Sequence, residues 1–352
     1  MSRRDDMAPE SDRFEEFPHP RENETLIGHD AACAEFFEAW KAGRLPQAWI
    51  LGGQEGIGKA TFAWRAARFL LANGDANPQA RPDLFTPRAH PAFHKTASLS
   101  HGDLFVLRRE WNDRAKPPKH FTDIRVDDVR RAIHVFQHAA SAEGGYRVCI
   151  VDCAEDLNAS AANALLKLIE EPPPRSVFFI VAHKPAQVIP TIRSRCRKLL
   201  LRPLSEDDLV KTAAAVGVEA PTADIAAAAV RAHGSAREML RILQGEGIDL
   251  DRAVQGLLDR LPQIDWRELH KLSDQVAARD AEVAWEAMLS AVFDWLSRQL
   301  RLREGQGAAR LARFAEVWEK VAAEARETAA LNLDKRPLVL SIFSNLAAAA
   351  RD

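Results

Sequence analysis

The sequence predicts an α/β domain with a wound parallel sheet, followed by two helical regions. Short apolar runs of strand length alternate with helical patterns up to about residue 203, and strand signals stop there. A glycine-rich loop lies directly between the first strand and its helix. The 352 residues exceed the roughly 250–300 that one hydrophobic core usually serves, so we expect more than one domain.

Apolar runs define the expected strands. Strands of a parallel sheet are buried on both faces, so they are almost continuously apolar. Such runs are Ala48–Leu51, Arg147–Asp152, Val177–Ala182 and Lys198–Arg202. One more, Leu104–Leu107, lies in a segment rich in Pro, His and Asp, residues 74–121, which we interpret as a connection or insertion outside the core.

Helical patterns separate these strands. Phe36 and Trp40 before the first strand, and Val129 and Ile133 before the Arg147–Asp152 run, repeat at helical spacing. A further helix should cover residues 158–171, because the three prolines that follow cannot continue it.

Two capping signals follow the last strand. Ser205 with Asp208, and Ser235 with Glu238, have the spacing of a capping box, in which the serine hydroxyl accepts a backbone N–H of the first turn. We therefore expect helices to begin at both serines.

These patterns give the expected domain boundaries. They are residues 1–24, a disordered polar segment; 25–203, the α/β domain; 204–246, a small helical domain; and 247–352, a helical bundle. The densest apolar face of the bundle comprises Trp285, Met288, Leu289, Val292, Phe293, Trp295 and Leu296. A face of this kind forms a core or, in part, a subunit interface, and the sequence leaves both open.

Composition excludes several classes of protein. A formal net charge of −2 does not require a nucleic-acid partner, and 47% hydrophobic with 28% charged residues is ordinary for a folded chain. Because no secretion signal or membrane-length apolar run is found, we expect a cytoplasmic protein without a membrane partner. The four cysteines form no CxxC pair, and His90, His94, His101 and His120 lack partners at ligand spacing, so no metal site is expected.

The glycine-rich loop matches a P-loop. Gly53, Gly58 and Lys59 fit the GxxxxGK pattern, with Gly56 between them. In such a loop the backbone amides and the helix N-terminus surround phosphate oxygens, and the lysine neutralises their charge. Because a strand and a helix flank the loop in the required order, the pattern indicates a phosphate-binding site.

Two positions needed for hydrolysis are altered. The residue after the lysine should carry a hydroxyl for Mg²⁺ but is Ala60, and Thr61 comes one residue late, about 100° further round the helix. Asp152 ends a strand at the position of the metal-binding aspartate, and Cys153 replaces the glutamate that orients the attacking water. The sequence therefore predicts weak hydrolysis at most.

Several motifs resemble one family, the clamp-loader subunits of bacterial DNA polymerase III. Asn163–Lys167 followed by Glu170–Pro173 looks like their NALLK and LEEPP signature, and Ser194–Cys196 resembles their SRC motif. Further features resemble the delta-prime subunits of alphaproteobacterial type: Leu45–Pro46, Gly234–Arg237 and Leu331–Asp334, together with the Ala60 and Cys153 departures.

The resemblance implies an architecture and roles for single residues. It implies a RecA-like AAA+ P-loop domain, a helical lid domain and a C-terminal helical collar through which five subunits join. Arg195 would be an arginine finger donated to the ATP site of an adjacent subunit, and Arg237 would lie at the sensor 2 position of the nucleotide site. Weak or vestigial ATP or ADP binding is compatible with this. The family's four-cysteine zinc module is missing from the sequence, so zinc is not expected.

The implied partners are the gamma/tau and delta subunits and, through the complex, the sliding clamp and primer-template DNA. The holoenzyme is a DNA-directed DNA polymerase, a nucleotidyltransferase, but this chain shows no polymerase carboxylate site. Three alternatives stay open: an active gamma/tau-type ATPase that uses Lys59 and Asp152, a P-loop kinase or metabolic NTPase, and a scaffold in which Arg195 forms an ordinary salt bridge.

Overall fold

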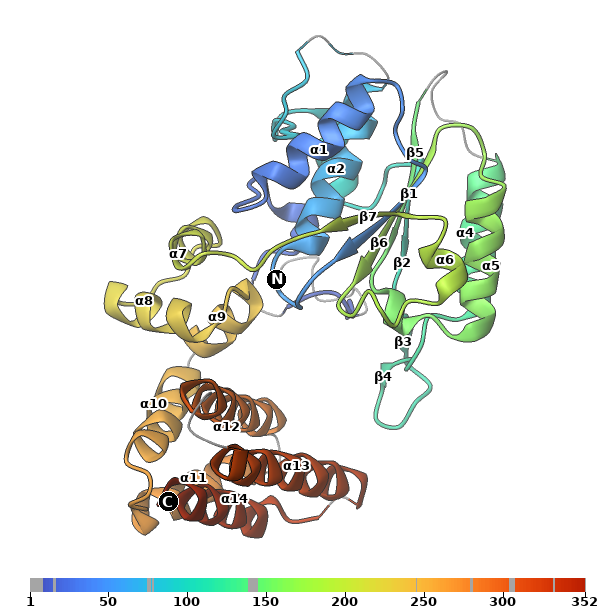
Figure 1. Cartoon of the computed structure of the whole chain (residues 1–352). Helices are drawn as coiled ribbons and strands as arrows, with labels where there is room; N and C mark the ends of the chain where they lie inside the picture. The colour runs from blue at the N-terminus through green and yellow to red at the C-terminus, as the bar shows by residue number, and fades with distance from the viewer. Residues whose placement is uncertain are drawn as a thin grey trace. The chain divides into compact units, whose positions relative to one another are not determined.

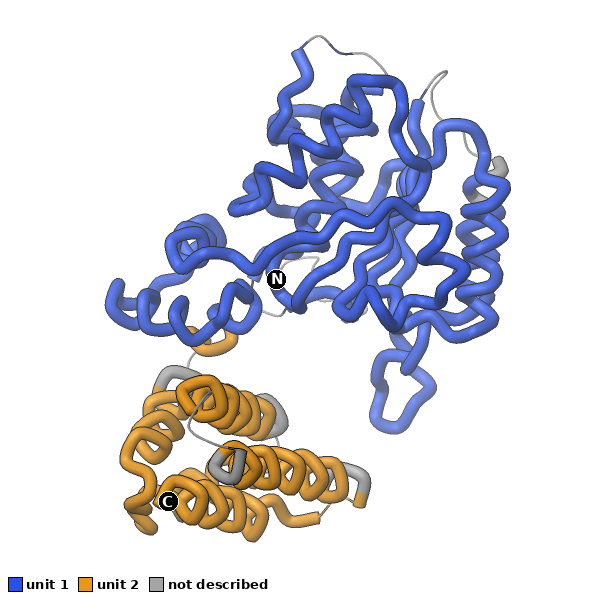
Figure 2. Tube along the Cα trace, in the orientation of Figure 1, with its two compact units in different colours: residues 1–240 blue, residues 241–352 orange. Residues whose placement is uncertain are grey.

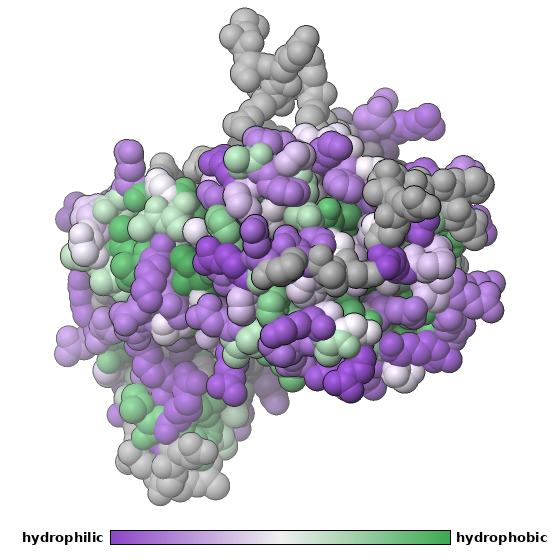
Figure 3. Space-filling view, turned by 90° about the horizontal axis from the view of Figure 1, so that it is seen from above, coloured by the Kyte–Doolittle hydropathy of each residue, from purple (hydrophilic) through white to green (hydrophobic). Residues whose placement is uncertain are grey.

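The computed structural model describes residues 9–14, 17–74, 77, 79–138, 145–244, 246–278, 281–303, 308–331 and 333–351. The chain divides into two compact units, residues 1–240 and 241–352 (Figure 2). No helix in these described ranges has both the length and the apolar character needed to cross a membrane. Hydrophilic side chains predominate on the face shown in Figure 3.

A five-stranded parallel sheet forms the centre of the first unit (Figure 1). Its strands are β1 (Ala48–Gly52), β2 (Leu104–Leu107), β5 (Arg147–Val151), β6 (Ser176–Ala182) and β7 (Arg197–Leu200), in the order β2-β5-β6-β1-β7. Every residue of β1 and β6 is buried, as the apolar runs predicted. The wound parallel α/β sheet expected from the sequence is therefore present.

Helices cover both faces of the sheet (Figure 1). On one face Trp49 and Phe179 pack with α1 and α2, and on the other Ile50 and Phe178 pack with α4 and α5, because successive side chains of a strand point to opposite faces. The helices of the α/β domain are η1 (Pro20–Glu22), α1 (Asp30–Lys41), α2 (Lys59–Asn73), α3 (Pro91–Ala97), α4 (Val126–His138), η2 (Ala154–Asp156), α5 (Ala159–Glu170) and α6 (Pro190–Arg193).

Three helices follow the sheet, and two of them, α7 and α9, begin where the capping signals predicted. They are α7 (Glu206–Ala215), α8 (Thr222–Arg231) and α9 (Ala236–Leu243). The Ser205 hydroxyl accepts from the Asp208 N–H at 3.1 Å, and the Ser235 hydroxyl accepts from the Glu238 N–H at 3.2 Å. Each serine satisfies a helix N–H that would otherwise lack a partner.

The interpretation of residues 74–121 as lying outside the core is wrong in part. Strand β2 pairs in parallel with β5, so it belongs to the central sheet. Leu84 and Phe93 are also buried, the latter on α3. The apolar residues of this segment are too few and too widely spaced to form a recognisable periodic pattern. The hairpin of β3 (Trp111–Asn112) and β4 (Lys119–His120) projects away from the sheet (Figure 1).

The expectation that residues 1–24 are disordered is wrong for the part of this segment that the structure describes. Residues 9–14 and 17–24 pack on the α/β domain, where η1 forms and the side chains of His19 and Arg21 are buried. The polar composition misled the prediction because these charged groups pair with residues far along the chain, and such pairing leaves no local signal.

The second unit is a helical bundle. Its helices are α10 (Glu246–Asp259), α11 (Trp266–Val276), α12 (Glu282–Leu302), α13 (Ala308–Leu331) and α14 (Lys335–Ala350). The apolar face of α12 lies in the core, where Trp285, Met288 and Trp295 are buried. Asp334 caps α14 by accepting from the Arg336 N–H at 3.0 Å. Asn332, which belongs to the Leu331–Asp334 motif noted in the sequence, lies outside the described residues.

Candidate nucleotide site

The P-loop leaves the carboxyl edge of the sheet. Gly52, the last residue of β1, pairs with Ala182 of β6 and Leu200 of β7, so the ends of these strands are level. Residues that directly follow strands therefore meet at this edge, the position at which parallel α/β sheets bind ligands. Asp152 and His183 follow β5 and β6 there.

Glycine is required in the loop for conformation and for space. Gly56 has a φ of 77°, and a Cβ atom there would lie 2.3 Å from the Ser235 hydroxyl oxygen and 2.5 Å from Cβ of Arg237. Gly53 has a φ of 146°, and its Cβ would lie 2.7 Å from the carbonyl oxygen of Leu201. A larger residue at either position would push the loop away from its neighbours.

Lys59 begins α2 and is only 3% exposed. Its ammonium donates hydrogen bonds to the carbonyl oxygen of Gly53 at 2.7 Å and to that of Gln54. Burial lowers the pKa of Lys59 to about 8, although the charges of Glu55 and Asp152 act to raise it. A phosphate at this loop would compete with the carbonyl groups for the ammonium.

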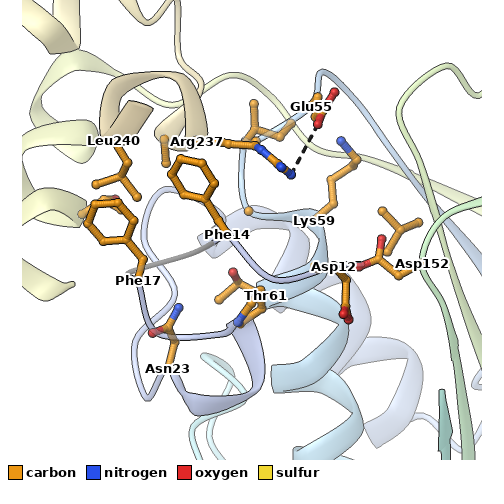
Figure 4. A pocket seen from close by; sticks show the side chains of 18 of the residues that line it. Asp12, Phe14, Phe17, Asn23, Glu55, Lys59, Thr61, Asp152, Arg237 and Leu240 are labelled. Atoms are coloured by element: carbon orange, nitrogen blue, oxygen red, sulfur yellow. Dashed lines mark ion pairs between the residues drawn. The ribbon is translucent and has the colours of Figure 1, made fainter. Parts of the chain in front are cut away.

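A cavity of about 390 Å³ adjoins the loop (Figure 4). Of the predicted nucleotide-binding residues, Gly56, Gly58, Lys59, Ala60, Thr61, Asp152 and Arg237 line this cavity. Gly53 is not among the lining residues, but its carbonyl accepts from Lys59. The structure thus brings the predicted set together, and Thr61 also lines the cavity despite its position one residue late.

Arg237 connects the helical region to the loop. Its backbone N–H donates to the carbonyl of Gly56 at 3.3 Å, and its guanidinium lies 3.5 Å from the Glu55 carboxylate (Figure 4). The guanidinium also lies over the ring of Phe14, 5.2 Å from the ring centroid. With Lys59, it supplies positive charge for an anionic ligand.

Two residues at the positions used for hydrolysis have shifted pKa values. Burial raises the pKa of Asp152 to about 7, with a further contribution from the charge of Asp12 and an opposing one from Lys59. Burial also raises the pKa of the Cys153 thiol, which keeps this group neutral. Because Ala60 lacks a hydroxyl and Asp152 binds its proton tightly, these residues do not fit a magnesium ion. Across the described residues, no cluster of three or more metal-binding side chains occurs.

Several cavity residues have no role in the predicted site. His183 could have been identified, because it directly follows a strand that neighbours β1. Arg109 and Asp156, which form a 2.9 Å ion pair, and Asp12 and Phe14 also line the cavity. Asp12 and Phe14 come from the segment that we expected to be disordered, so no feature of the sequence indicated that they lie here.

Arg195 lies away from this cavity, between α6 and β7. Its Nε is 2.7 Å from the Glu170 carboxylate, its Nη1 donates to the Thr191 carbonyl at 3.1 Å, and its side chain is 45% exposed. Arg197, two residues later, pairs with Trp49 at the beginning of β1. Three residues at about 3.3 Å each separate this pair from Gly52, so Arg197 lies roughly 10 Å from the edge at which the P-loop leaves the sheet. Arg195 precedes β7 and therefore lies at the opposite, amino edge of the sheet.

Sequence comparison identifies the family. Residues 28–205 match the family described as "DNA polymerase III, delta subunit". The chain is 32% identical to DNA polymerase III subunit delta' of Pseudomonas aeruginosa, over 70% of this chain and 68% of that one. It is 28% identical to subunit delta' of Escherichia coli (74% and 72% covered) and 25% identical to subunit gamma of Buchnera aphidicola (85% and 81%). The chain therefore belongs to the DNA polymerase III delta-prime family of clamp-loader subunits.

Proposed function

We propose that this clamp-loader subunit donates Arg195 to the ATP site of a neighbouring ATPase subunit and hydrolyses little or no ATP itself. The observation that supports the proposal most directly is the position of Arg195. Its side chain is exposed, and it precedes β7, at the edge of the sheet opposite the one that bears the chain's own P-loop. Such an arginine is available to another subunit and not to its own site.

The chemistry of phosphoryl transfer suits this residue. Negative charge spreads over the γ-phosphate oxygens in the transition state, and a planar, permanently charged guanidinium stabilises it with two parallel hydrogen bonds. The Glu170 carboxylate contacts Nε and the Thr191 carbonyl accepts from Nη1, so these contacts hold the guanidinium without using Nη2. A finger of this kind contributes roughly 10³–10⁵ in rate in other NTPases.

The chain's own site supports binding of an anion but not hydrolysis. Lys59 and Arg237 provide positive charge beside the loop. Ala60 lacks the hydroxyl that binds magnesium, Cys153 lacks the carboxylate that orients the attacking water, and the raised pKa of Asp152 makes it a weaker metal ligand. We propose weak binding of ATP or ADP, without zinc.

The partners follow from the family. Relatives of this chain are named gamma as well as delta', so we propose a cytoplasmic hetero-oligomer with gamma/tau and delta subunits. In that complex the subunit would help to load the sliding clamp on primer-template DNA. Catalysis by the polymerase would belong to other chains of the holoenzyme.

Reconstitution of the complex with Arg195→Ala tests the proposal. Folding and assembly should be unchanged, while clamp-stimulated ATPase activity and clamp loading at limiting ATP should fall several-fold. The other ATP sites mask part of the loss. Arg197→Ala is a matched control, because Arg197 is also an exposed arginine, paired with Glu35 at 2.7 Å.

If Arg195→Ala supports the same clamp loading as Arg197→Ala, the chain is a scaffold and Arg195 forms a surface salt bridge worth about 0–1 kcal/mol.

A gamma/tau-type ATPase is the second candidate. The joint position of Lys59, Asp152 and Arg237 around one cavity favours it. ATP turnover by the isolated chain distinguishes the two candidates.

A further inference from the structure

The N-terminal segment lies across the nucleotide cavity. We name residues 9–14 and 17–20 the strap. Its residues Ser11, Asp12, Phe14, Phe17, Pro18 and Pro20 line the same cavity as the P-loop. Figure 4 shows Asp12 beside Asp152, and Phe14 close to Arg237. The strap thus occupies space next to the groups that would bind a nucleotide.

A buried ion network holds the strap in place. Arg108, directly after β2, contacts the carboxylates of Glu10 and Asp12, each at 2.7 Å. Arg21 contacts Glu10 at 2.9 Å. The Glu10 and Asp12 side chains are 7% and 3% exposed, so solvent screens these pairs little. The strap is therefore fixed to the edge of the sheet.

His19 adds a directional contact. Its Nδ1 accepts the backbone N–H of Arg21 at 3.1 Å, so in the neutral ring the proton is on Nε2. Nε2 lies 3.1 Å from the Asp12 carboxylate and can donate to it. The ring packs edge-on against Trp64, which is fully buried. Asp12 is thus held from two sides, by Arg108 and by His19.

The closed strap opposes the binding of phosphate. Asp12 places a carboxylate in the cavity wall near Asp152, whose pKa the charge of Asp12 raises and that of Arg108 lowers. Arg237, one of the cationic residues of the cavity, lies over the Phe14 ring and near Glu55. A nucleotide would have to displace these contacts.

We infer that the strap is an internal cap that competes with nucleotide for this P-loop. Nucleotide then binds only to molecules whose strap has opened, and the apparent Kd rises in inverse proportion to the open fraction. The inference goes beyond the proposed role of Arg195, since that role needs no nucleotide in this chain. It also separates two causes of inactivity: the altered residues limit hydrolysis, and the strap limits binding.

Titration of the full-length chain with ADP, by calorimetry, tests the inference. The double variant Asp12→Ala/Phe14→Ala removes the charge and the ring and should lower the Kd for ADP by about tenfold or more, the value for a strap that is open about 10% of the time. Addition of Lys59→Ala to that variant should abolish the gain. Asp127→Ala, at an exposed carboxylate on α4, is the control and should leave the Kd unchanged.

Phe14→Ala alone keeps the ion network intact, so it tests the inference even if the double variant folds poorly. Hydrogen exchange gives a second measurement: ADP should increase the exchange of residues 9–14. Equal or weaker ADP binding by both variants, with unchanged exchange in the strap, would overturn the inference. Weaker binding would show instead that the strap forms part of the nucleotide site.

Discussion

Glu170 at the end of α5 and Arg195 after α6 form an ion pair at 2.7 Å, which connects two of the motifs found in the sequence. Both side chains are partly exposed, so the pair contributes only about 0–1 kcal/mol to stability. Its effect is to orient the guanidinium. The Thr191 carbonyl and the Ser194 hydroxyl hold Nη1 at 3.1 and 3.3 Å from another side.

The first prediction concerns this orientation. Glu170→Ala should leave folding and assembly intact but lower clamp-stimulated ATPase activity of the reconstituted complex, by less than Arg195→Ala does. The double variant should be no worse than Arg195→Ala, because Glu170 acts only through the arginine. Glu35→Ala, which frees Arg197 instead, is the control. Additive losses in the double variant would show that Glu170 has a separate role.

The second prediction is that the isolated chain has no appreciable ATPase activity. Ala60 and Cys153 replace the hydroxyl and the carboxylate that hydrolysis requires. Turnover should stay far below the rate of about 1 s⁻¹ typical of slow enzymes. Steady turnover above that rate, lost in Lys59→Ala, would identify the chain as a gamma/tau-type ATPase.

The sequence predicted the features that local rules determine. Strands β1 and β6 followed from apolar runs, and the helix starts at Ser205 and Ser235 from the capping spacing. The P-loop residues were found because their pattern is contiguous. Such signals lie within a few residues of the structure that they specify.

The remaining features depend on contacts between distant parts of the chain. Asp12 and Arg108 are 96 residues apart, and neither position indicates the other. Phe14 likewise meets Arg237 only in the folded chain. A polar segment with paired charges therefore resembles a disordered one in sequence, which is why the strap was missed.

The third prediction tests how the strap is anchored. Arg108→Ala leaves Glu10 with Arg13 and Arg21, and Asp12 with His19. Loss of one partner of a buried pair costs about 3–5 kcal/mol unless the structure can open. The strap should therefore open more often, and its amide exchange should rise at least tenfold. Arg130→Ala, which breaks an exposed pair with Asp127, should leave strap exchange unchanged.

The same network gives a dependence on pH. Burial acts to raise the pKa values of Glu10 and Asp12, but their hydrogen bonds and the nearby positive charges outweigh it and lower both to about 2. Because these values are below those of the open segment, the network stabilises the closed strap above about pH 4.5 and less as the pH falls toward 2. Acid should therefore reduce the protection of the strap amides from exchange, and this reduction should be smaller in Arg108→Ala than in the unmodified chain.

The fourth prediction concerns Asp152, whose pKa is shifted in the opposite direction. Since its pKa in the folded chain is about 7 instead of 3.8, the folded state binds this proton more tightly than the unfolded state does. The proton bound by Asp152 therefore stabilises the folded state most at low pH, and this stabilisation is lost as the pH rises from about 4 to 7. Asp152→Asn should be more stable than the unmodified chain by about 1–3 kcal/mol at pH 7.5 and by less at pH 5. Urea unfolding at both pH values gives the comparison, and a constant difference would contradict the assigned shift.

The last prediction separates the core of the second unit from its surface. Trp285 is 4% exposed and packs in the bundle core, whereas Trp266, at the start of α11, is 51% exposed. Trp285→Ala should destabilise the bundle by about 3–5 kcal/mol, because it removes a large buried side chain. Trp266→Ala should change stability by less than about 1 kcal/mol.

Assembly should respond in the opposite order. Exposed tryptophans are enriched at protein interfaces, and Leu302, Leu331 and Leu333 are further exposed apolar residues of this unit. We expect Trp266→Ala to weaken binding of the full chain to its partner subunits at least tenfold, measured by sedimentation of the reconstituted complex at several concentrations. Arg252→Ala, an exposed change on α10, should leave assembly intact. If Trp266→Ala assembles as tightly as Arg252→Ala, this part of the bundle surface does not contact a partner, and the interface must be sought elsewhere on the chain.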